Sequence, residues 1–450
     1  MKGGNGMERK ILDKFKLWKE SANRKPLILG GVRQVGKTWA LKEFGRVCYR
    51  NVAYFNFEER AEYRQFFETT MDVGRILRNL SMAGGQPIEP GETLLVFDEI
   101  QDCPEALTSL KYFFENAPEY HVACAGSLLG VMLARPASFP VGKVDFLYLN
   151  PMTFTEFLAA NESDNLAEYL ESVDEVAPLP DVFFNPLCEN LKMYFVTGGM
   201  PESVKLWTSR RDVGEVQQSL SNLLNAYERD FAKHPERKDV PKISMIWNSI
   251  PSQLARENKK FLYRAVKEGA RAREYEDALQ WLCDSGLAHK TYRSELPKPP
   301  LKAYDDISAF KIYMVDTGLL RRMASLDPSV FAERERLFLE FNGALSENYI
   351  LQALTDQFEL PPRYWTKEGS PRYEVDFLIQ RKNAVYPVEV KAGGNVEGRS
   401  LKKYAEIYGT DVPLRIRFSL RNLKLDGDTL NIPLFMADQI DRLISLCEGR

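Results

Sequence analysis

A glycine-rich segment near the amino terminus has the residue types and spacing of a loop that binds phosphate. The segment GGVRQVGKT places Gly31, Gly36, Lys37 and Thr38 in the pattern G-x-x-x-x-G-K-T, between the strand-like PLIL and the helix-like WALKEF. Glycines let backbone N–H groups turn toward phosphate oxygens, lysine reaches the β- and γ-phosphates, and threonine can ligate Mg²⁺. The alternative is a glycine-rich turn without a ligand. We expect ATP and Mg²⁺ here, with the nucleotide-binding residues Gly31, Val32, Arg33, Gln34, Val35, Gly36, Lys37, Thr38 and Trp39.

Two adjacent acids follow a second apolar run, LLVFDE. Asp98 would end a buried strand, where it can hold Mg²⁺ through water, and Glu99 can orient or deprotonate an attacking water. A solvated strand end is the alternative, although two charges beside a buried strand are costly. The pattern predicts Lys37 and Glu99 as catalytic residues of ATP hydrolysis, with Thr38 and Asp98 as metal ligands.

Polar residues after the next apolar run offer further contacts with a nucleotide. HVACA predicts a strand, and Ser127 follows it at the edge where a hydroxyl can sense the γ-phosphate. Ser127 can equally be the N-cap of a following helix. Arg135 and Lys143 can each supply positive charge to a neighbouring subunit's nucleotide, which would imply a homo-oligomer, or they can be solvated surface charges.

A second group of candidate residues lies near the carboxyl end. YEVDFLIQ and VYPVEVKA alternate as strands do, and a hairpin would bring Asp376, Glu389 and Lys391 to one side. Two carboxylates beside a lysine suit a Mg²⁺-dependent phosphodiesterase, in which all three would be catalytic. A structural cluster of salt bridges is the alternative. Glu347 shares the apolar face of a predicted helix, so it needs a buried partner, and we expect Glu347, Asp376 and Glu389 as metal ligands.

The elements around these residues change in kind along the chain. Residues 26–29, 52–57, 93–97 and 121–125 read as apolar strands alternating with amphipathic helices, which predicts a parallel α/β sheet. Helix-period sequence then runs to about residue 235, interrupted at 177–186 and at 197–201, and it predicts a helical lid.

The segment after the lid reads as helices followed by a strand-like LAHKTYR, which predicts a helix-turn-helix with a wing. The stretch LPKPP at 296–300 predicts a stiff linker. We expect four domains: an ATPase core at 1–150, the lid at 151–240, the winged-helix-like segment and linker at 241–300, and a nuclease-like α/β domain at 301–450.

Bulk composition excludes several classes of protein. The chain has 450 residues, 44% of them hydrophobic, a formal net charge of −3, six cysteines without CxxC pairs and three histidines. Disorder, a zinc cluster and general attraction to nucleic acid or membrane are not expected. Without a signal-like or membrane-spanning stretch, we expect a cytoplasmic protein.

DNA binding would need a local basic patch. Candidates lie in the predicted winged helix, but acids lie among them, so a solvated helix face is the alternative. The basic residues are Lys259, Lys260, Arg264, Lys267, Arg271 and Arg273.

Several motifs in order give the chain a family resemblance: GGVRQVGKTW, LLVFDEIQDCPEAL, AGSLLGV, NPMTFTEFL, YFVTGGMPESV, FKIYMVDTGLL, ENYILQAL, and EVDFLIQ followed by YPVEVKAG. It resembles, nearly end to end, the prokaryotic AAA-type ATP-binding proteins whose carboxy-terminal domain of unknown function is related to the restriction-endonuclease PD-(D/E)xK fold. The resemblance implies a P-loop NTPase core, a helical lid, a winged-helix-like segment and a nuclease-like α/β domain. Its ATPase positions match Gly31, Gly36, Lys37, Thr38, Asp98 and Glu99, and its nuclease-like positions match Glu347, Asp376, Glu389 and Lys391. Many relatives have Gly-Arg where this chain has Gly142-Lys143, so a role specific to arginine is not carried over.

Two functions follow from these features. In the first, an ATPase positions a carboxy-terminal domain that acts on DNA. In the second, a nucleotide-gated ATPase controls partner binding, and the nuclease-like domain is an inactive scaffold.

Overall fold

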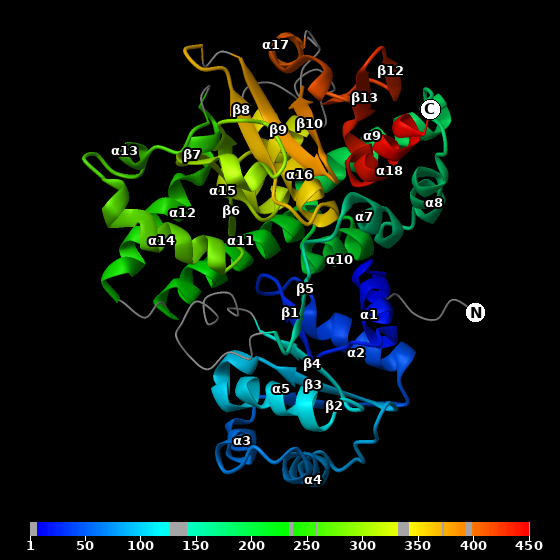
Figure 1. Ribbon diagram of the computed structural model, residues 1–450, viewed down its shortest axis with the longest axis vertical. Helices are drawn as coiled ribbons and strands as arrows, with labels where there is room; N and C mark the ends of the chain where they lie inside the picture. The colour runs from blue at the N-terminus through cyan, green and yellow to red at the C-terminus, as the bar shows by residue number, and fades with distance from the viewer. Residues whose placement is uncertain are drawn as a thin grey trace. The chain divides into compact units, whose positions relative to one another are not determined.

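The computed structural model describes residues 7–126, 142–233, 237–256, 259–331, 342–370, 373–391 and 398–449 (Figure 1). The chain divides into two compact units. The small unit comprises Glu8–Asn150 and Asp284–Leu287, and the large unit comprises Met1–Met7, Pro151–Cys283 and Ala288–Arg450. The small unit is therefore built from two separate parts of the sequence.

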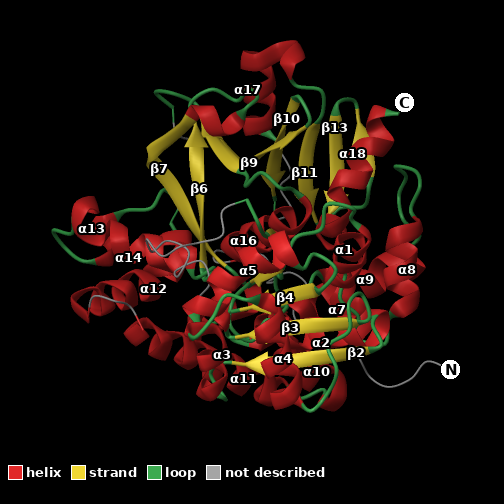
Figure 2. Ribbon diagram, turned by 60° about the horizontal axis from the view of Figure 1, so that its bottom comes forward, coloured by secondary structure: helices red, strands yellow, loops and turns green. Residues whose placement is uncertain are grey.

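A parallel five-stranded sheet forms the core of the small unit, in the order β2-β3-β4-β1-β5. Figure 2 shows β2, β3 and β4 side by side. The inner strands β1, β3 and β4 are buried throughout, as in sheets covered on both faces. The predicted parallel α/β sheet is thus confirmed. Sequence analysis does not predict the edge strand β5, which buries no residue fully. The strands are β1 Leu27–Gly30, β2 Asn51–Asn56, β3 Thr93–Asp98, β4 His121–Ala125 and β5 Asp145–Tyr148.

Helices cover both faces of this sheet. On one face, α1 and α2 pack together, with the rings of Phe15 and Phe44 centred 5.1 Å apart. On the other face, α4 and α5 contribute Leu80 and Leu110 to a buried cluster that contains Phe55 and Phe97. The helices are α1 Ile11–Glu20, α2 Lys37–Cys48, α3 Gln65–Glu68, α4 Val73–Gly84 and α5 Pro104–Asn116.

The large unit begins with helices, as the helix-period sequence predicts. No helix among the described residues is long and apolar enough to cross a membrane. Its helices are α7 Phe154–Ala160, α8 Asp164–Ser172, α9 Asp181–Thr197, α10 Pro201–Arg210, α11 Val213–Asp230, α12 Val240–Leu254, α13 Tyr263–Val266, α14 Ala272–Asp284, α15 Thr317–Met323, α16 Asn342–Gln357, α17 Arg399–Tyr408 and α18 Ile440–Glu448; the last residue of α14 lies in the small unit.

The first predicted break, at residues 177–186, is present only in part. Helix α8 ends at Ser172 and α9 begins at Asp181, so residues 177–180 lie between helices, but Pro186 lies inside α9. The carbonyl that loses its hydrogen bond belongs to Val182, which is exposed and can bond to water instead. The second predicted break is present, since α9 ends at Thr197 and α10 begins at Pro201.

An eight-stranded mixed sheet occupies the rest of the large unit, in the order β12-β13-β11-β10-β9-β8-β6-β7. The expected hairpin is present as the antiparallel pair β9 and β10, and β10 pairs in parallel with β11. The strands are β6 Ala288–Ser294, β7 Asp305–Met314, β8 Arg363–Thr366, β9 Glu374–Arg381, β10 Ala384–Val390, β11 Arg415–Ser419, β12 Lys424–Asp426 and β13 Thr429–Pro433.

The predicted wing belongs to this sheet. Strand β6 pairs antiparallel with β7 and meets β8 at Arg293. The proline-rich stretch 296–300 therefore connects two paired strands, where sequence analysis places a linker between domains. Glu295 N donates to Tyr304 O at 2.9 Å, which closes this connection into a loop.

A close approach of two glycine-containing segments holds α9, α10 and α15 together. A Cβ on Gly318 would lie 2.5 Å from Gly198 N, so the backbones meet where a side chain cannot fit. Buried Asp316 bridges the segments, because its carboxylate accepts from Gly199 N at 2.7 Å and from Leu319 N, at the start of α15, at 2.9 Å. Burial raises the pKa of Asp316 to about 6, against the effect of these donors.

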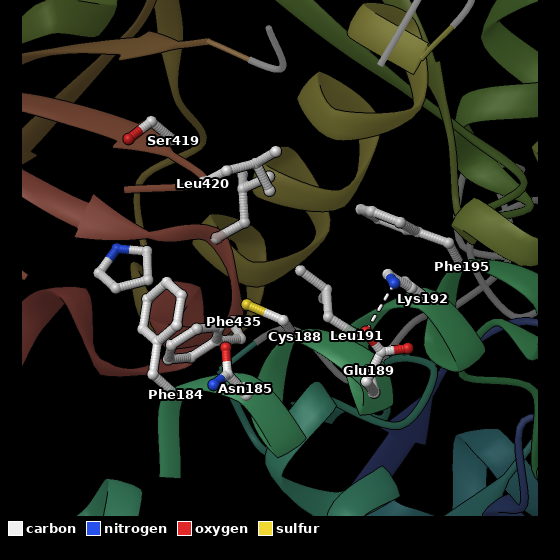
Figure 3. Close-up of a pocket in the computed structure, with 12 residues that line it drawn as sticks. Phe184, Asn185, Cys188, Glu189, Leu191, Lys192, Phe195, Ser419, Leu420 and Phe435 are labelled. Carbon is white, nitrogen blue, oxygen red and sulfur yellow. Dashed lines mark hydrogen bonds and ion pairs between the residues drawn. The ribbon is translucent and has the colours of Figure 1, made fainter. Parts of the chain in front are cut away.

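A pocket of about 240 Å³ lies between α9 and the strands β11 and β13 (Figure 3). Its lining is mainly apolar, with Phe184 and Phe435 meeting edge to face at a centroid distance of 5.3 Å. Lys192 and Glu189, also in the lining, form an ion pair at 2.6 Å. None of the candidate site residues lines this pocket.

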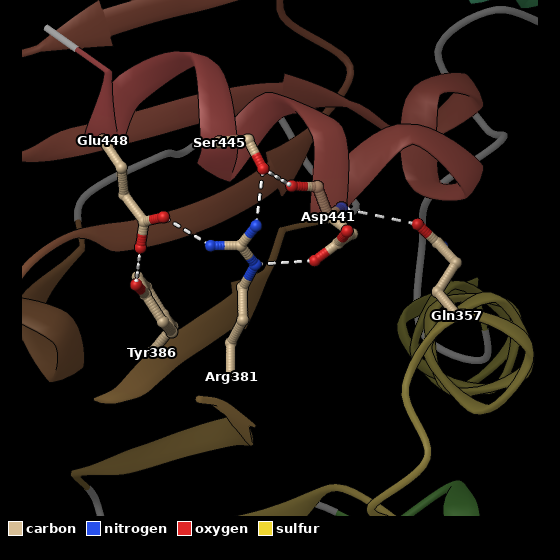
Figure 4. Close-up of polar contacts among 6 residues, drawn as sticks. All are labelled: Gln357, Arg381, Tyr386, Asp441, Ser445 and Glu448. Atoms are coloured by element: carbon tan, nitrogen blue, oxygen red, sulfur yellow. Dashed lines mark hydrogen bonds and ion pairs between the residues drawn. The ribbon is translucent and has the colours of Figure 1, made fainter. Parts of the chain in front are cut away.

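Polar contacts, most of them from Arg381, attach the last helix to the sheet. Arg381, at the end of β9, donates to Asp441 at 2.7 Å and to Ser445 at 2.5 Å, and it also pairs with Glu448 (Figure 4). Tyr386 of β10 bonds to the same Glu448. These contacts hold α18 against the β9–β10 hairpin.

We expect Asp316→Ala to lower the free energy of unfolding by about 2–4 kcal/mol, because buried backbone donors lose their acceptor. Asp212→Ala is the matched control. Asp212 caps α11 through Glu215 N at an exposed position, so its loss should cost about 1 kcal/mol. Urea unfolding followed by circular dichroism measures both, and equal losses would contradict the role given to Asp316.

Candidate functional site

The predicted phosphate loop joins β1 to α2, and its backbone depends on glycine. Gly31 and Gly36 have φ values of 142° and 99°, which lie in the region that favours glycine. A Cβ on Gly31 would lie 2.5 Å from Leu149 O, the residue after β5. The loop is therefore held close to the sheet edge while α2 begins at Lys37.

Lys37 is buried within this loop. Its ammonium donates to Gly31 O and Val32 O, both at 2.8 Å. Burial lowers the pKa of Lys37 to about 8, although the charges of Glu99 and Asp98 oppose the shift. The side chain is thus bound to loop carbonyls that an anion can replace.

Asp98 is the centre of the polar contacts. Its Oδ2 accepts from Thr38 Oγ1 and from Tyr54 OH, both at 2.7 Å, and its Oδ1 accepts from Glu99 N at 3.0 Å. The hydroxyl of Thr38 and the carboxylate of Asp98 are hard oxygen ligands side by side, so the pair fits Mg²⁺. Sequence analysis missed Tyr54, a hydroxyl-bearing side chain on β2, next to β3.

Glu99 has a strained backbone. It has a φ of 50° and begins the short turn after β3, a conformation that non-glycine residues adopt rarely and mainly where function requires it. Gln101 Nε2 donates to Glu99 Oε2 at 2.5 Å. The carboxylate is therefore oriented by a neighbour that the motif does not include.

The other predicted residues of the loop have different surroundings. Val32 and Val35 are buried, so their side chains anchor the loop, whereas Trp39 is 38% exposed on α2. Arg9, not foreseen from the sequence, donates to Val35 O at 3.0 Å and to Asn150 O at 2.6 Å. It ties the phosphate loop to the chain after β5.

The structure describes only one of the three further residues that we expect to contact a nucleotide. Ser127 and Arg135 lie outside the described residues. Lys143 forms an ion pair with Glu115 at 3.2 Å and lies over the ring of Phe114. Both partners of Lys143 thus belong to the small unit, which also contains Lys143 itself.

In the large unit, the hairpin brings the predicted acids and lysine together. Asp376 lies on β9, and its Oδ2 accepts from Val390 N of β10 at 2.8 Å. Glu389 is buried on β10 and pairs with Lys391 at 2.8 Å. Burial, and next the charge of Glu347, raises the pKa of Asp376 to about 7.

Glu347 of α16 has partners that sequence analysis did not predict. It pairs with Lys259, and its Oε2 accepts from Tyr313 OH at 3.1 Å. Burial alone would raise the pKa of Glu347, but Lys259 and Lys311 hold it below its ordinary value. Lys259 is 14% exposed, so it does not belong to a solvated basic face.

These acids do not form a metal site as they are placed. Among the described residues, no group of three His, Cys, Asp or Glu side chains is arranged to hold a metal ion. Glu389 Oε2 is buried and finds no hydrogen-bond partner in the described part of the chain. The charges of this cluster are instead offset by lysines.

Three segments of the chain match known families. Residues 23–158 match the AAA domain, residues 188–330 match a domain of unknown function, DUF8612, and residues 342–435 match another, DUF4143. Comparison with curated proteins finds no match.

Solved structures similar to the chain have low identity to it. A Walker-type ATPase of Pyrococcus abyssi is 16% identical, with 71% of this chain and 96% of that chain covered and a TM-score of 0.45. Orc1 of Aeropyrum pernix in complex with DNA is 15% identical, with 71% and 91% covered and a TM-score of 0.28. The RuvB Holliday junction branch migration motor of Thermotoga maritima is 15% identical, with 63% and 90% covered and a TM-score of 0.30. The match of residues 23–158 to the AAA domain includes the phosphate loop, Asp98 and Glu99.

Proposed function

We propose that the small unit binds ATP with Mg²⁺ and hydrolyses it. The observation that carries this proposal is the contact at 2.7 Å between Thr38 Oγ1 and Asp98 Oδ2, at the start of the helix that follows the phosphate loop. Two hard oxygen ligands thereby lie beside the loop that would hold the phosphates. Mg²⁺, when bound, offsets the negative charge of the phosphates.

Lys37 and Glu99 have separate parts in the proposed reaction. Lys37 leaves the carbonyls of Gly31 and Val32 for phosphate oxygens, whose charge favours its protonated form. Glu99, oriented by Gln101, accepts the proton of the attacking water. The water oxygen then bonds to the γ-phosphorus as the bond to the β-phosphate oxygen breaks, which yields ADP and phosphate.

We further propose that the nucleotide state is passed along the chain through the turn Asp284–Leu287. This turn belongs to the small unit and joins α14 to β6 in sequence. A Cβ on Gly286 would lie 3.2 Å from Val32 Cγ1, so the turn closely approaches the phosphate loop. A loop that rearranges around phosphate would therefore displace this turn.

For the large unit, action on DNA is the second candidate function. It is supported by Asp376 and Glu389 on two paired strands, with Lys391 directly after the second. Exposed basic residues on and around α13 and α14 support it too, although acids lie among them. The competing candidate is an inactive scaffold that the ATPase switches. The pairing of Glu347 with Lys259 favours this scaffold in the state described.

We expect Lys37→Ala to weaken ATP binding at least about tenfold, because a charge-assisted contact with phosphate is lost. Glu99→Gln should retain binding but lower turnover at least about 100-fold, since the proton acceptor is absent. Calorimetry and phosphate release separate the two effects. Lys111→Ala, at an exposed lysine of α5, is the control. Hydrolysis at the wild-type rate by both Lys37→Ala and Glu99→Gln would contradict the assignment of the ATP site.

Tyr54→Phe should raise the Mg²⁺ concentration for half-maximal turnover about fivefold, because Asp98 loses the hydrogen bond from the phenol, which is worth about 1 kcal/mol. Turnover at saturating Mg²⁺ should change little. A titration of phosphate release against Mg²⁺ measures this, and an unchanged midpoint would show that the phenol does not position Asp98.

Cleavage of labelled DNA tests the second candidate. If the large unit is a nuclease, the wild-type chain should cut with Mg²⁺ or Mn²⁺ in at least one of the two conditions, with ATP or without it, and Asp376→Ala should lower that rate at least about 100-fold. Asp426→Ala, at an exposed acid of β12, should cut as the wild type does. If none of the proteins cuts, the scaffold candidate replaces the nuclease.

A further inference from the structure

Lys259 reaches the carboxylate cluster from outside the sheet. It lies between α12 and α13, whereas Lys311 and Lys391 are on or beside strands of the sheet itself. Its ammonium pairs with Glu347, and both side chains are largely buried, at 14% and 7% exposure. Lys259 is therefore not part of the strands that carry Asp376 and Glu389.

Two contacts fix the segment that carries this lysine. The Gln253 side chain donates to Leu262 O at 3.0 Å and accepts from Leu262 N at 3.1 Å. Phe261 N donates to Phe310 O at 2.7 Å, and the two rings stack with centroids 5.3 Å apart. The segment is thus attached to α12 and to β7 through two places, which together set the position of Lys259.

The lysines offset the charge of the acids in the absence of metal. Lys259 pairs with Glu347, Lys391 pairs with Glu389, and buried Lys311 pairs with Glu374 at 2.5 Å. Buried carboxylates require such compensation, and a divalent cation would supply the same charge.

Both carboxylate oxygens of Glu347 have a partner while Lys259 is in place, and the partner of one of them carries a positive charge that repels a cation. Oε1 is taken by Lys259 and Oε2 by Tyr313. Mg²⁺ and Mn²⁺ in protein sites need several oxygen ligands with suitable geometry. The buried Glu389 Oε2 lacks a hydrogen-bond partner among the described residues, so the cluster keeps one acceptor oxygen that a cation can use.

We propose that Lys259 is a releasable counter-ion that occupies Glu347 and excludes a divalent cation from the cluster of Glu347, Asp376 and Glu389. When the segment around Lys259 withdraws, these carboxylates bind the cation in its place. The inference concerns only the large unit and does not depend on ATP hydrolysis. It bears on the second candidate function, because it states why the acids form no metal site in the state described.

The test is cation binding by full-length protein without nucleotide, in an Asp98→Asn background that weakens the candidate metal site of the small unit. Lys259→Met should bind Mn²⁺ at least tenfold more tightly than its parent, measured by electron paramagnetic resonance of free Mn²⁺. In EDTA the variant should have a lower melting temperature than its parent, because Glu347 is left unpaired. Saturating Mn²⁺ should then raise that temperature by at least about 3 °C, and the parent's by much less.

Matched variants separate a counter-ion from a structural contact. Lys259→Arg keeps the charge, so it should show no gain in Mn²⁺ binding. The double change Lys259→Met with Glu347→Gln removes both charges, so it should regain stability without responding to Mn²⁺. Lys242→Met is the control for the loss of an ion pair outside the carboxylate cluster, because Lys242 pairs with the largely buried Asp239. Mn²⁺ should not restore any stability that this variant loses.

Unchanged Mn²⁺ affinity in Lys259→Met, or an equal gain in Lys259→Arg, would overturn the inference. If Lys259→Met folds only when Mn²⁺ is present, the inference is supported; failure to fold in Mn²⁺ while the double variant folds would overturn it. Mn²⁺ binding without any DNA cleavage would leave the inference in place and remove the nuclease candidate.

Discussion

Carboxylates that leave water need partners, and this protein places its buried acids where separate elements meet. Burying an unpaired charge costs several kcal/mol of folding free energy. Each buried acid is therefore stable only where hydrogen-bond donors or cations pack around it. Asp98 joins the phosphate loop to β2 and β3. Asp316 joins the start of α15 to the turn between α9 and α10. Glu347 joins α16 to β7 and to the segment that carries Lys259.

The partners of these acids differ in how readily they can be exchanged. Asp316 is held by backbone N–H groups of buried segments, and such contacts cannot be replaced without moving the helices. Asp98 is held largely by neutral hydroxyls, which can give way to a cation at little electrostatic cost. Glu347 is held in part by an ammonium, so a cation there must first displace a charge of the same sign. The same chemical group is therefore paired mainly with backbone N–H groups at Asp316, with neutral hydroxyls at Asp98 and in part with an ammonium at Glu347.

Much of the small unit can be predicted from sequence, because its signals are local. Four apolar runs correspond to β1 to β4. The inner strands β1, β3 and β4 are apolar on both faces, and the edge strand β2 still buries two alternate residues, Ala53 and Phe55. The edge strand β5 was missed because it buries no residue fully. In the large unit, the proline-rich stretch reads locally as a linker between domains. Pairing of β6 with β7 shows that it closes a hairpin, and a linker and a hairpin loop share the same turn residues.

The sequence by itself determined the glycine-rich loop after β1, the two acids at the end of β3 and the alternation that places Asp376 and Glu389 on neighbouring strands. In each case the residues are contiguous or lie within one hairpin, so backbone geometry relates them. Only the tertiary structure decided that Tyr54 bonds to Asp98, that Arg9 holds the phosphate loop, and that Lys259 pairs with Glu347. Those partners come from distant segments, and a buried charge accepts any suitable donor that packing brings near. The choice of donor is therefore made by packing rather than by local sequence.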